Sequence, residues 1–199
     1  MIVFSLGVYS SGSTWVFNVI QEIVSVTSNN SIAVYAEDAP SLLASCSDLH
    51  DFTVVKCHAM DQKLMNLALM TGAKIITSVR DPRDCVLSLS QRFGLNDDEA
   101  RQLIDRSVVA VASVQLNFDC LQLVYEDRFT ENPATIALIA DWLGVGLTDQ
   151  QQQSIFAKYG IEQVRKLVQG FAEQGHTPSW FDPATHWHVN HVGDGKSGK

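Results

Sequence analysis

Residues 4–24 read FSLGVYSSGSTWVFNVIQEIV: a short apolar strand, a turn rich in glycine and serine, and an apolar helix. In this arrangement the backbone N–H groups at the helix N-terminus surround an anion. Gly7, Gly12 and Thr14 have the spacing of a Walker A phosphate loop, but Ser13 occupies the position of its lysine. ATPases and kinases use that lysine on the β- and γ-phosphates. The loop therefore favours a nucleotide whose 5′ end carries something other than a triphosphate.

The composition sets broad limits on the class of protein. The 199 residues suit a single domain, with a hydrophobic content of 46% and a net charge of −8. Such an acidic chain lacks the basic field that non-specific binding to nucleic acid or to a membrane surface needs. Residues 74–92 are a local exception that is typical of a small-anion site, although a solvated helix face would look the same. The charges there are Lys74, Arg80, Arg83 and Arg92 against Asp81 and Asp84.

Cysteine usage and hydropathy indicate a cytoplasmic protein. Cysteines stand at positions 46, 57, 85 and 120 with no C-x-x-C pair, which favours free, reduced thiols. The N-terminus lacks the basic region of a signal peptide, and no run approaches the ~20 apolar residues of a membrane span. No feature demands a particular oligomeric state.

Short apolar segments alternate with helical ones along the chain. The expected strands are 1–6, 53–57, 73–79 and 121–125, and the expected helices are 14–26, 62–71, 82–93, 97–117, 133–143, 148–159 and 161–172. This alternation predicts a three-layer α/β/α fold with a mostly parallel central sheet, of the P-loop nucleotide-binding type. We expect residues 28–52 to be loop with a short helix near 40–45, and residues 175–199 to be a flexible C-terminal tail.

Two further stretches place polar side chains at strand ends. Lys56 and His58 close the strand that starts at Thr53, and they share one face because side chains alternate along a strand. A cation beside a histidine can serve charge stabilisation and proton transfer at one reacting centre. A strand end that simply meets solvent is the alternative.

The third stretch, IITSVRDPRDCVLS at residues 75–88, combines a strand, a turn and a helix start. Arg80 and Ser88 suit a second phosphate because the guanidinium fork matches phosphate oxygens. A salt bridge between Arg80 and Asp84 is the alternative. Ligands of α/β sheets bind at the carboxyl ends of the strands, so we expect all three stretches to line one cleft.

In order along residues 1–145, these motifs resemble those of sulfotransferases that use 3′-phosphoadenosine 5′-phosphosulfate (PAPS). YSSGSTW at 9–15 resembles the family's 5′-phosphosulfate loop PKSGTTW, and KCH at 56–58 resembles its KTH segment. Arg80 and Ser88 match its 3′-phosphate signature. YED at 125–127 and WLG at 142–144 resemble later family motifs.

The resemblance implies transfer of a sulfuryl group from PAPS to a hydroxyl, or an amine, of a small-molecule acceptor, with no metal required. It makes His58 the general base and Lys56 the group that stabilises developing charge. It makes residues 1–145 the cofactor-binding core. The cofactor-binding residues that it implies are Ser10, Ser11, Gly12, Ser13 and Thr14 for the phosphosulfate, Trp15 and Tyr125 near the adenine, Arg80 and Ser88 for the 3′-phosphate, and Lys196.

The chain also departs from the family's pattern. Ser10 stands where the family has its loop lysine, so Lys56 or the lysines of the tail must compensate. Residues 195–199 only echo the family's late RKGxxGDW segment. These departures leave open a non-catalytic module that binds adenosine 3′,5′-bisphosphate. The Gly7–Thr14 spacing also leaves open a P-loop kinase of small molecules, which would lack the loop lysine and an acidic magnesium-binding strand end.

A histidine cluster near the C-terminus has one further interpretation. His186, His188 and His191 have nitrogen atoms that could serve as metal ligands, but no cysteine or acidic residue lies at ligand spacing. We therefore expect a solvated tail. The loops at 28–52 and 93–100 would shape the acceptor pocket, and their sequences do not identify the acceptor.

Overall fold

The central sheet has five parallel strands. The computed structural model describes residues 1–46, 48–177 and 180–192. The strand order is β2-β3-β1-β4-β5, and all neighbouring strands are parallel. The strands are β1 (Ile2–Gly7), β2 (Ser31–Tyr35), β3 (Phe52–Cys57), β4 (Lys74–Val79) and β5 (Leu121–Val124).

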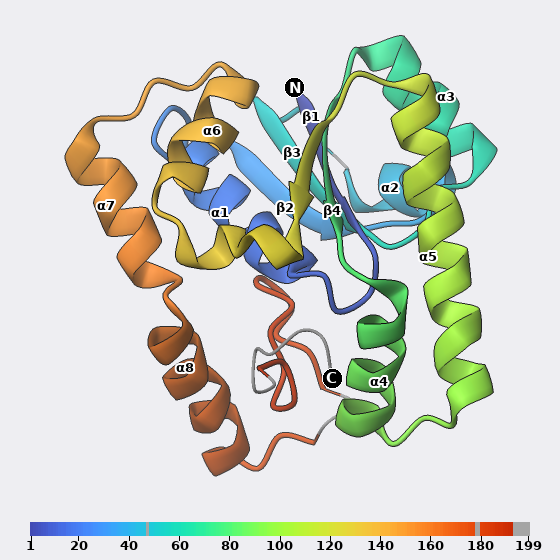
Figure 1. Cartoon of the computed structure of the whole chain (residues 1–199). Coiled ribbons are helices and arrows are strands. Elements are labelled where there is room, and N and C mark those ends of the chain that lie inside the picture. Colours follow the sequence, from blue (N-terminus) through green and yellow to red (C-terminus); the bar gives the residue numbers. More distant parts are fainter. Residues whose placement is uncertain (47, 178–179, 193–199) are drawn as a thin grey trace.

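Helices cover both faces of this sheet, as Figure 1 shows. They are α1 (Ser13–Ser25), α2 (Ala39–Ser45), α3 (Gln62–Thr71), α4 (Pro82–Phe93), α5 (Asp97–Asn117), α6 (Ala134–Leu143), α7 (Asp149–Lys158) and α8 (Ile161–Glu173). Two short 3₁₀ turns, Tyr125–Asp127 and Phe129–Glu131, follow β5. The predicted three-layer α/β fold is confirmed.

Alternation along the strands divides the core into two clusters. Val3 of β1 and Ile76 of β4 pack on the face covered by α1 and α6, whereas Phe4 and Ile75 pack on the face covered by α3 and α5. All four side chains are fully buried. Strands buried on both faces read as continuous apolar runs, which is why β1, β3 and β4 were predictable from the sequence.

Local signals fix the ends of the helices beside the site. Helix α4 covers the predicted residues 82–93, because Asp81 accepts a hydrogen bond from the Arg83 amide at 2.9 Å and Gly94 ends the helix at φ 68°. Proline at the first helical position adds a preset φ. The amphipathic pattern and these caps agree, so α4 lies where the sequence predicts it.

Strand β2 was not predicted, since residues 28–52 were expected to be loop around the short helix that is now α2. Its sequence SIAVY has one buried side chain, Val34, while Ser31 and Tyr35 are exposed. It is an edge strand that pairs only with β3 among the described strands. An edge strand needs no apolar run, and its pairing comes from backbone contacts with β3.

Residues 180–192, part of the segment expected to be a flexible tail, pack against the core. The Nδ2 atom of Asn18 donates to the Thr185 carbonyl at 2.8 Å, and Trp187 is 3% exposed in the cluster beside α1 and α8. The expectation that the histidines there are solvated is wrong, because His188 is 2% exposed. Its imidazole packs edge-on against Phe181, with ring centroids 4.8 Å apart, and it lies 5.1 Å from the ring of Phe93.

None of the helices within the described ranges combines the length and the apolar character needed to cross a membrane.

Candidate functional site

The loop between β1 and α1 is held in an unusual backbone conformation. Ser10 and Gly12 have φ angles of 67° and 84°. A Cβ on Gly7 would lie 2.3 Å from the Ser78 hydroxyl, so the loop approaches β4 as closely as glycine allows. The Ser11 hydroxyl lies 2.9 Å from the Ser78 carbonyl and 2.6 Å from the Val8 carbonyl. Ser11 is fully buried, so its side chain anchors the loop rather than facing a ligand.

Helix α1 begins without a side-chain cap. Its N-cap residue is Gly12, and its first turn contains no acidic residue. The first amides of a helix lack intrahelical acceptors, and the helix dipole places partial positive charge there. Those amides belong to Ser13 and Thr14, both nearly buried. This uncapped N-terminus fits an anionic group.

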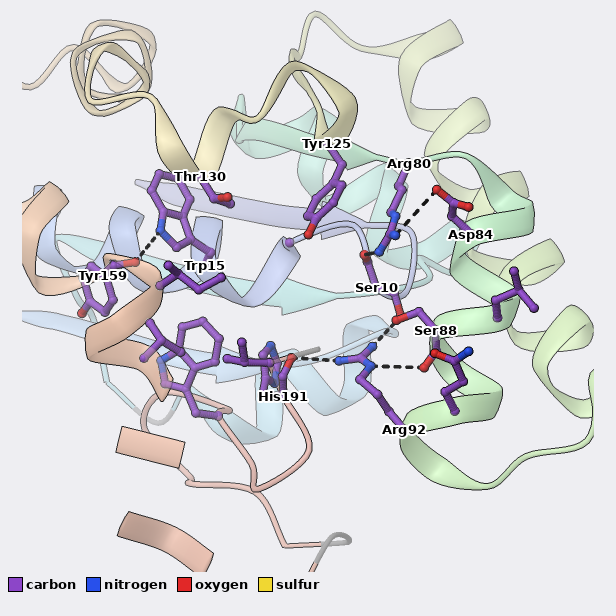
Figure 2. Close-up of a pocket in the computed structure, with 17 residues that line it drawn as sticks. Ser10, Trp15, Arg80, Asp84, Ser88, Arg92, Tyr125, Thr130, Tyr159 and His191 are labelled. Atoms are coloured by element: carbon purple, nitrogen blue, oxygen red, sulfur yellow. Dashed lines mark hydrogen bonds and ion pairs between the residues drawn. The ribbon is translucent and has the colours of Figure 1, made fainter. Parts of the chain in front are cut away.

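A first cavity of about 320 Å³ opens beside this N-terminus (Figure 2). Residues from both halves of the chain line it. They include Ser10, Gly12, Trp15, Arg80, Asp84, Ser88, Arg92, Tyr125, Thr130, Tyr159, Trp187 and His191. The indole N–H of Trp15 donates to the Tyr159 carbonyl at 3.1 Å, which fixes the ring at the cavity wall. The cavity thus combines aromatic walls with two guanidinium groups, as a nucleotide with a phosphate needs.

Arg80 is held on several sides at the end of β4. Its Nη1 donates to the Ser10 carbonyl at 3.2 Å, and its guanidinium lies 4.5 Å from the centre of the Tyr125 ring. Its Nη2 lies 3.7 Å from the Asp84 carboxylate, with both side chains 8% exposed. The salt bridge considered as an alternative therefore exists, and Arg80 still lines the cavity together with Ser88.

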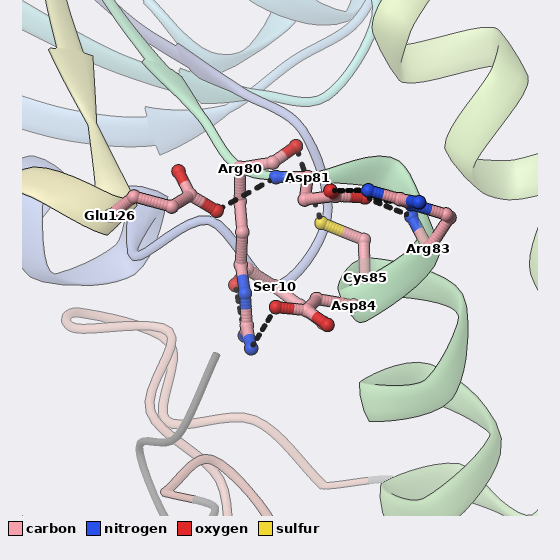
Figure 3. A network of polar contacts seen from close by, with 7 residues as sticks. All are labelled: Ser10, Arg80, Asp81, Arg83, Asp84, Cys85 and Glu126. Carbon is pink, nitrogen blue, oxygen red and sulfur yellow. Dashed lines mark hydrogen bonds and ion pairs between the residues drawn. The ribbon is translucent and has the colours of Figure 1, made fainter. Parts of the chain in front are cut away.

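The turn that carries Arg80 is itself fixed by polar contacts (Figure 3). The Asp81 amide donates to the Glu126 carboxylate at 2.9 Å, which ties the end of β4 to the 3₁₀ turn after β5. Asp81 also pairs with Arg83 at 2.6 Å on the protein surface. The YED motif at 125–127 thus supplies Tyr125 to the cavity and Glu126 to the turn.

A second cavity of about 280 Å³ contains the Lys56–His58 pair. The Nζ of Lys56 lies 2.9 Å from Nε2 of His58, and Nδ1 of His58 lies 2.7 Å from the Gly7 carbonyl oxygen. The carbonyl requires the proton on Nδ1, so Nε2 carries the lone pair and accepts from the lysine. The predicted shared face of these two residues is confirmed.

Burial alters the acidity of both groups. It lowers the pKa of Lys56 to about 8, and it holds the pKa of His58 well below its ordinary value, with the Lys56 charge as the next cause. The Tyr9 ring stacks on the His58 imidazole at 3.8 Å, and the Glu37 carboxylate accepts from the His58 amide at 3.3 Å. His58 is therefore neutral and held in a fixed orientation near pH 7.

The two cavities meet at four residues: Ser10, Gly12, Arg92 and His191. Arg92 comes from the last turn of α4, and its Nη2 donates to the Ser10 hydroxyl. Its Nη1 donates to the His191 carbonyl at 3.0 Å. This junction, defined by these four residues, lies between the nucleotide-type cavity and the cavity of the Lys56–His58 pair.

Most of the predicted site residues line two adjoining cavities rather than the single cleft that was expected. The first cavity contains Ser10, Gly12, Trp15, Arg80, Ser88 and Tyr125, and the second contains Ser10, Gly12, Ser13, Thr14, Lys56 and His58. Ser11 lines neither cavity. Lys196 lies outside the described residues. No group of three or more histidine, cysteine, aspartate or glutamate side chains in the described ranges has the geometry of a metal site.

Sequence reasoning missed three residues beside the reacting groups. Tyr9 and Glu37 contact His58 from the loop after β1 and from the segment after β2. Arg92 was counted as part of a basic stretch but was not assigned to the site. The spacing along α4 could have assigned Arg92 to the site. Ser88 and Arg92 are four residues apart, so they lie on the same face of the helix.

Comparisons with known proteins agree with this geometry at the level of the fold. No family model and no curated protein matches the chain. Among solved structures, retinol dehydratase with androsterone and the inactive cofactor PAP matches with a TM-score of 0.61 and 19% identity. The mouse sulfotransferase SULT7A1 with PAP matches with a TM-score of 0.61 and 14% identity.

This chain has the sulfotransferase fold. A second retinol dehydratase structure, with retinol and PAP, has a TM-score of 0.60 and 18% identity. Each match covers 82% of this chain but only 65% or 66% of the other chain. The chain therefore spans just under two thirds of the length of these structures.

Proposed function

We propose that this protein transfers a sulfuryl group from PAPS to a hydroxyl, or an amine, of a small-molecule acceptor. The observation that carries the proposal is the junction of the two cavities at an uncapped helix N-terminus. One cavity has the aromatic and guanidinium groups suited to a nucleotide, and the other has a lysine and a neutral histidine. PAP in the structural neighbours supports PAPS as the co-substrate.

The nucleotide would lie in the first cavity. Arg80 and Ser88 would bind its 3′-phosphate, and Trp15 and Tyr125 would flank its adenine. The helix N-terminus at Ser13 and Thr14 would bind the 5′-phosphosulfate. The donors fit such a ligand, because the Arg80 guanidinium lines the first cavity and the start of α1, at Ser13 and Thr14, lines the second cavity beside the shared residues Ser10 and Gly12.

His58 acts as the general base at Nε2. The acceptor oxygen bonds to sulfur as the bond between sulfur and the bridging oxygen breaks, and the acceptor proton passes to Nε2. The hydrogen bond from Nδ1 to the Gly7 carbonyl fixes the tautomer this transfer requires.

Lys56 has two partners in this mechanism. In the structure it donates to Nε2 of His58, the atom that must accept the proton. When its ammonium turns toward the charge on the bridging oxygen, the histidine lone pair becomes free. One movement thus stabilises the leaving group and exposes the base.

The second cavity favours an acceptor with a large apolar surface. Its apolar walls are formed by Leu89, Phe93, Leu95, Leu103 and Phe181. Retinol dehydratase holds retinol and androsterone in the neighbouring structures. We propose an apolar molecule with one hydroxyl as the acceptor.

All four cysteines are free thiols, which supports a cytoplasmic setting.

Transfer and binding together test this function. Adenosine 3′,5′-bisphosphate at 100 times its dissociation constant should stabilise the fold by about 2.7 kcal/mol, a rise of roughly 5–10 °C in the unfolding midpoint. 5′-AMP and ATP with magnesium should stabilise it less. His58→Gln should keep this stabilisation and lose transfer of labelled sulfate to simple phenols and alcohols.

The matched control is His50→Gln, which changes a histidine that lines neither cavity. Unchanged transfer in His58→Gln would remove His58 as the base. Bisphosphate binding without transfer to any acceptor would favour the non-catalytic module. Stabilisation by ATP with magnesium alone would favour the kinase.

A further inference from the structure

Arg92 lies at the phosphate loop although it is 82 residues from Ser10 in the chain. Helix α4 carries it there, and its Nη2 donates to the Ser10 hydroxyl, as Figure 2 shows. Ser10 occupies the position at which the sulfotransferases that this loop resembles have a lysine. A cation from α4 is therefore located where the loop itself lacks one.

Neutral groups hold the Arg92 guanidinium in place. Nε donates to the Ser88 carbonyl at 3.3 Å, and Nη1 donates to the His191 carbonyl at 3.0 Å. No carboxylate lies within 4 Å of it among the described residues. Burial lowers the pKa of Arg92 to about 10, so the group is still charged near pH 7. A partly buried cation with neutral partners is costly, and an anionic ligand would offset that cost.

The position of Arg92 indicates which anion it contacts. It lines both cavities, whereas Arg80 lines only the first and Lys56 only the second. A phosphosulfate with its nucleoside in the first cavity and its sulfur facing His58 must cross this junction. Arg80 also donates to the Ser10 carbonyl at 3.2 Å, so two guanidinium groups converge on one loop residue.

We propose that Arg92 replaces the missing loop lysine: its guanidinium binds the 5′-phosphate oxygens and stabilises the charge left there by sulfuryl transfer. This rests on the proposed function. As the sulfur–oxygen bond breaks, the bridging oxygen keeps the electron pair and the acceptor proton goes to His58. Arg92 stays protonated throughout. The Ser10 hydroxyl accepts a hydrogen bond from its guanidinium and so holds it in position.

Binding of three nucleotides tests this assignment. Arg92→Met should weaken 5′-AMP and adenosine 3′,5′-bisphosphate by about ten- to a hundredfold, the effect of one charge-assisted hydrogen bond, and leave 3′-AMP unchanged. Arg80→Met should weaken 3′-AMP and leave 5′-AMP unchanged. The matched control is Arg83→Met on the same helix, an exposed arginine that lines neither cavity and should change nothing.

A rescue variant distinguishes a cation at the loop from a general packing effect. Ser10→Lys combined with Arg92→Met should regain most of the lost 5′-AMP affinity and transfer rate. If Arg92→Met does not fold, Arg92→Lys keeps the charge and should show a smaller loss for 5′-AMP and the bisphosphate and none for 3′-AMP.

Two outcomes overturn the inference while the proposed function stands: wild-type affinity for 5′-AMP in the Arg92 variants, or weakened 3′-AMP instead. The second outcome would assign Arg92 to the 3′-phosphate. A wild-type protein that binds none of the three nucleotides removes both the inference and the proposed function.

Discussion

At the scale of single residues, Lys56 and His58 behave as one unit. The lysine ammonium donates to the nitrogen that would accept a proton, so binding of an anion to the lysine and release of the base are coupled. Both groups are buried, and burial disfavours a charge on either. The pair therefore carries a single positive charge near neutral pH, and that charge resides on Lys56.

The pair predicts the pH dependence of catalysis. The proposed mechanism needs protonated Lys56, whose pKa is lowered from 10.5 to about 8, so kcat/KM should fall as the pH rises through about 8. On the acid side the pKa of His58 lies well below 6.5, so activity should persist below that pH. Lys56→Arg should move the alkaline fall upward, because an arginine stays charged. A kcat/KM that stays constant up to pH 9.5 in the wild-type protein would contradict this assignment.

The sequence predicted that Lys56 and His58 share one face of a strand but did not predict the contact of Arg92 with Ser10, for a physical reason. The first depends on the alternation of side chains within one strand, which is local. The second joins a loop after β1 to the last turn of α4, and it depends on how the helix packs. The missing lysine at position 10 was visible in the sequence, whereas its replacement required three-dimensional placement.

At the scale of elements, α1 gives up a stabilising cap. Helices α3, α5 and α7 each have a side chain that accepts a hydrogen bond from a first-turn amide, but α1 begins at Gly12 with none. A missing cap typically costs about 1 kcal/mol. Helices α6 and α8 also begin without a side-chain cap, so the missing cap alone does not distinguish α1. The start of α1 lies at the two cavities, where an anion would supply the acceptor that a cap provides in α3, α5 and α7.

Gly12→Ala tests the loop geometry. The new Cβ would lie 2.9 Å from the Phe129 ring at a φ of 84°, so the variant should lose about 1–2 kcal/mol for the left-handed conformation and more for the clash. Bisphosphate affinity should fall with it. Gly144→Ala is the matched control, since Gly144 has a φ of 72° with no atom within 4 Å of its Cβ. It should show only the conformational loss in urea unfolding. If the two variants were equally stable, the predicted clash between a Cβ at position 12 and the Phe129 ring would be contradicted.

The helices and strands beside the site could be predicted from local sequence patterns, and β2 is the exception. Strands β1, β3 and β4 are apolar on both faces, so their sequences reveal them. β2 has one buried side chain and owes its conformation to pairing with β3. No periodic pattern in the sequence of β2 identifies β3 as its pairing partner.

At the scale of the whole molecule, residues 180–192 close the junction between the cavities. His191 accepts from Arg92, and Asn190 donates to the Arg92 carbonyl at 2.7 Å. The sequence indicated a solvated tail because its histidines have no cysteine or acidic residue at ligand spacing. The structure buries His188 against Phe93 and Phe181 and packs the partly buried His191 against Trp187, so the neutral imidazoles act as packing groups.

Buried neutral histidines make the fold sensitive to acid. Burial lowers the pKa of His186 and His188 to about 4, and that of His191 lies well below 6.5, with the charges of Arg92 and Lys56 adding to the effect. An unfolded histidine takes up its proton below about pH 6.5, whereas folded His186 and His188, with a pKa of about 4, do so only at lower pH. The unfolded state thus binds more protons in this window, so the free energy of unfolding must fall as the pH decreases.

We therefore expect urea unfolding to report a loss of stability between pH 6.5 and 4, up to about 1.4 kcal/mol per pH unit for each buried histidine and less for the partly exposed His186. The double variant His186→Gln, His188→Gln should flatten this slope, because it removes two groups that the fold keeps neutral. His50→Gln leaves the buried histidines in place and should keep the wild-type slope.

If residues 180–192 pack as the structure shows, acid should also weaken bisphosphate binding, since Arg92 would lose the carbonyl of His191. A free energy of unfolding that is constant from pH 7 to 5 would instead mean that the segment does not bury its histidines in solution.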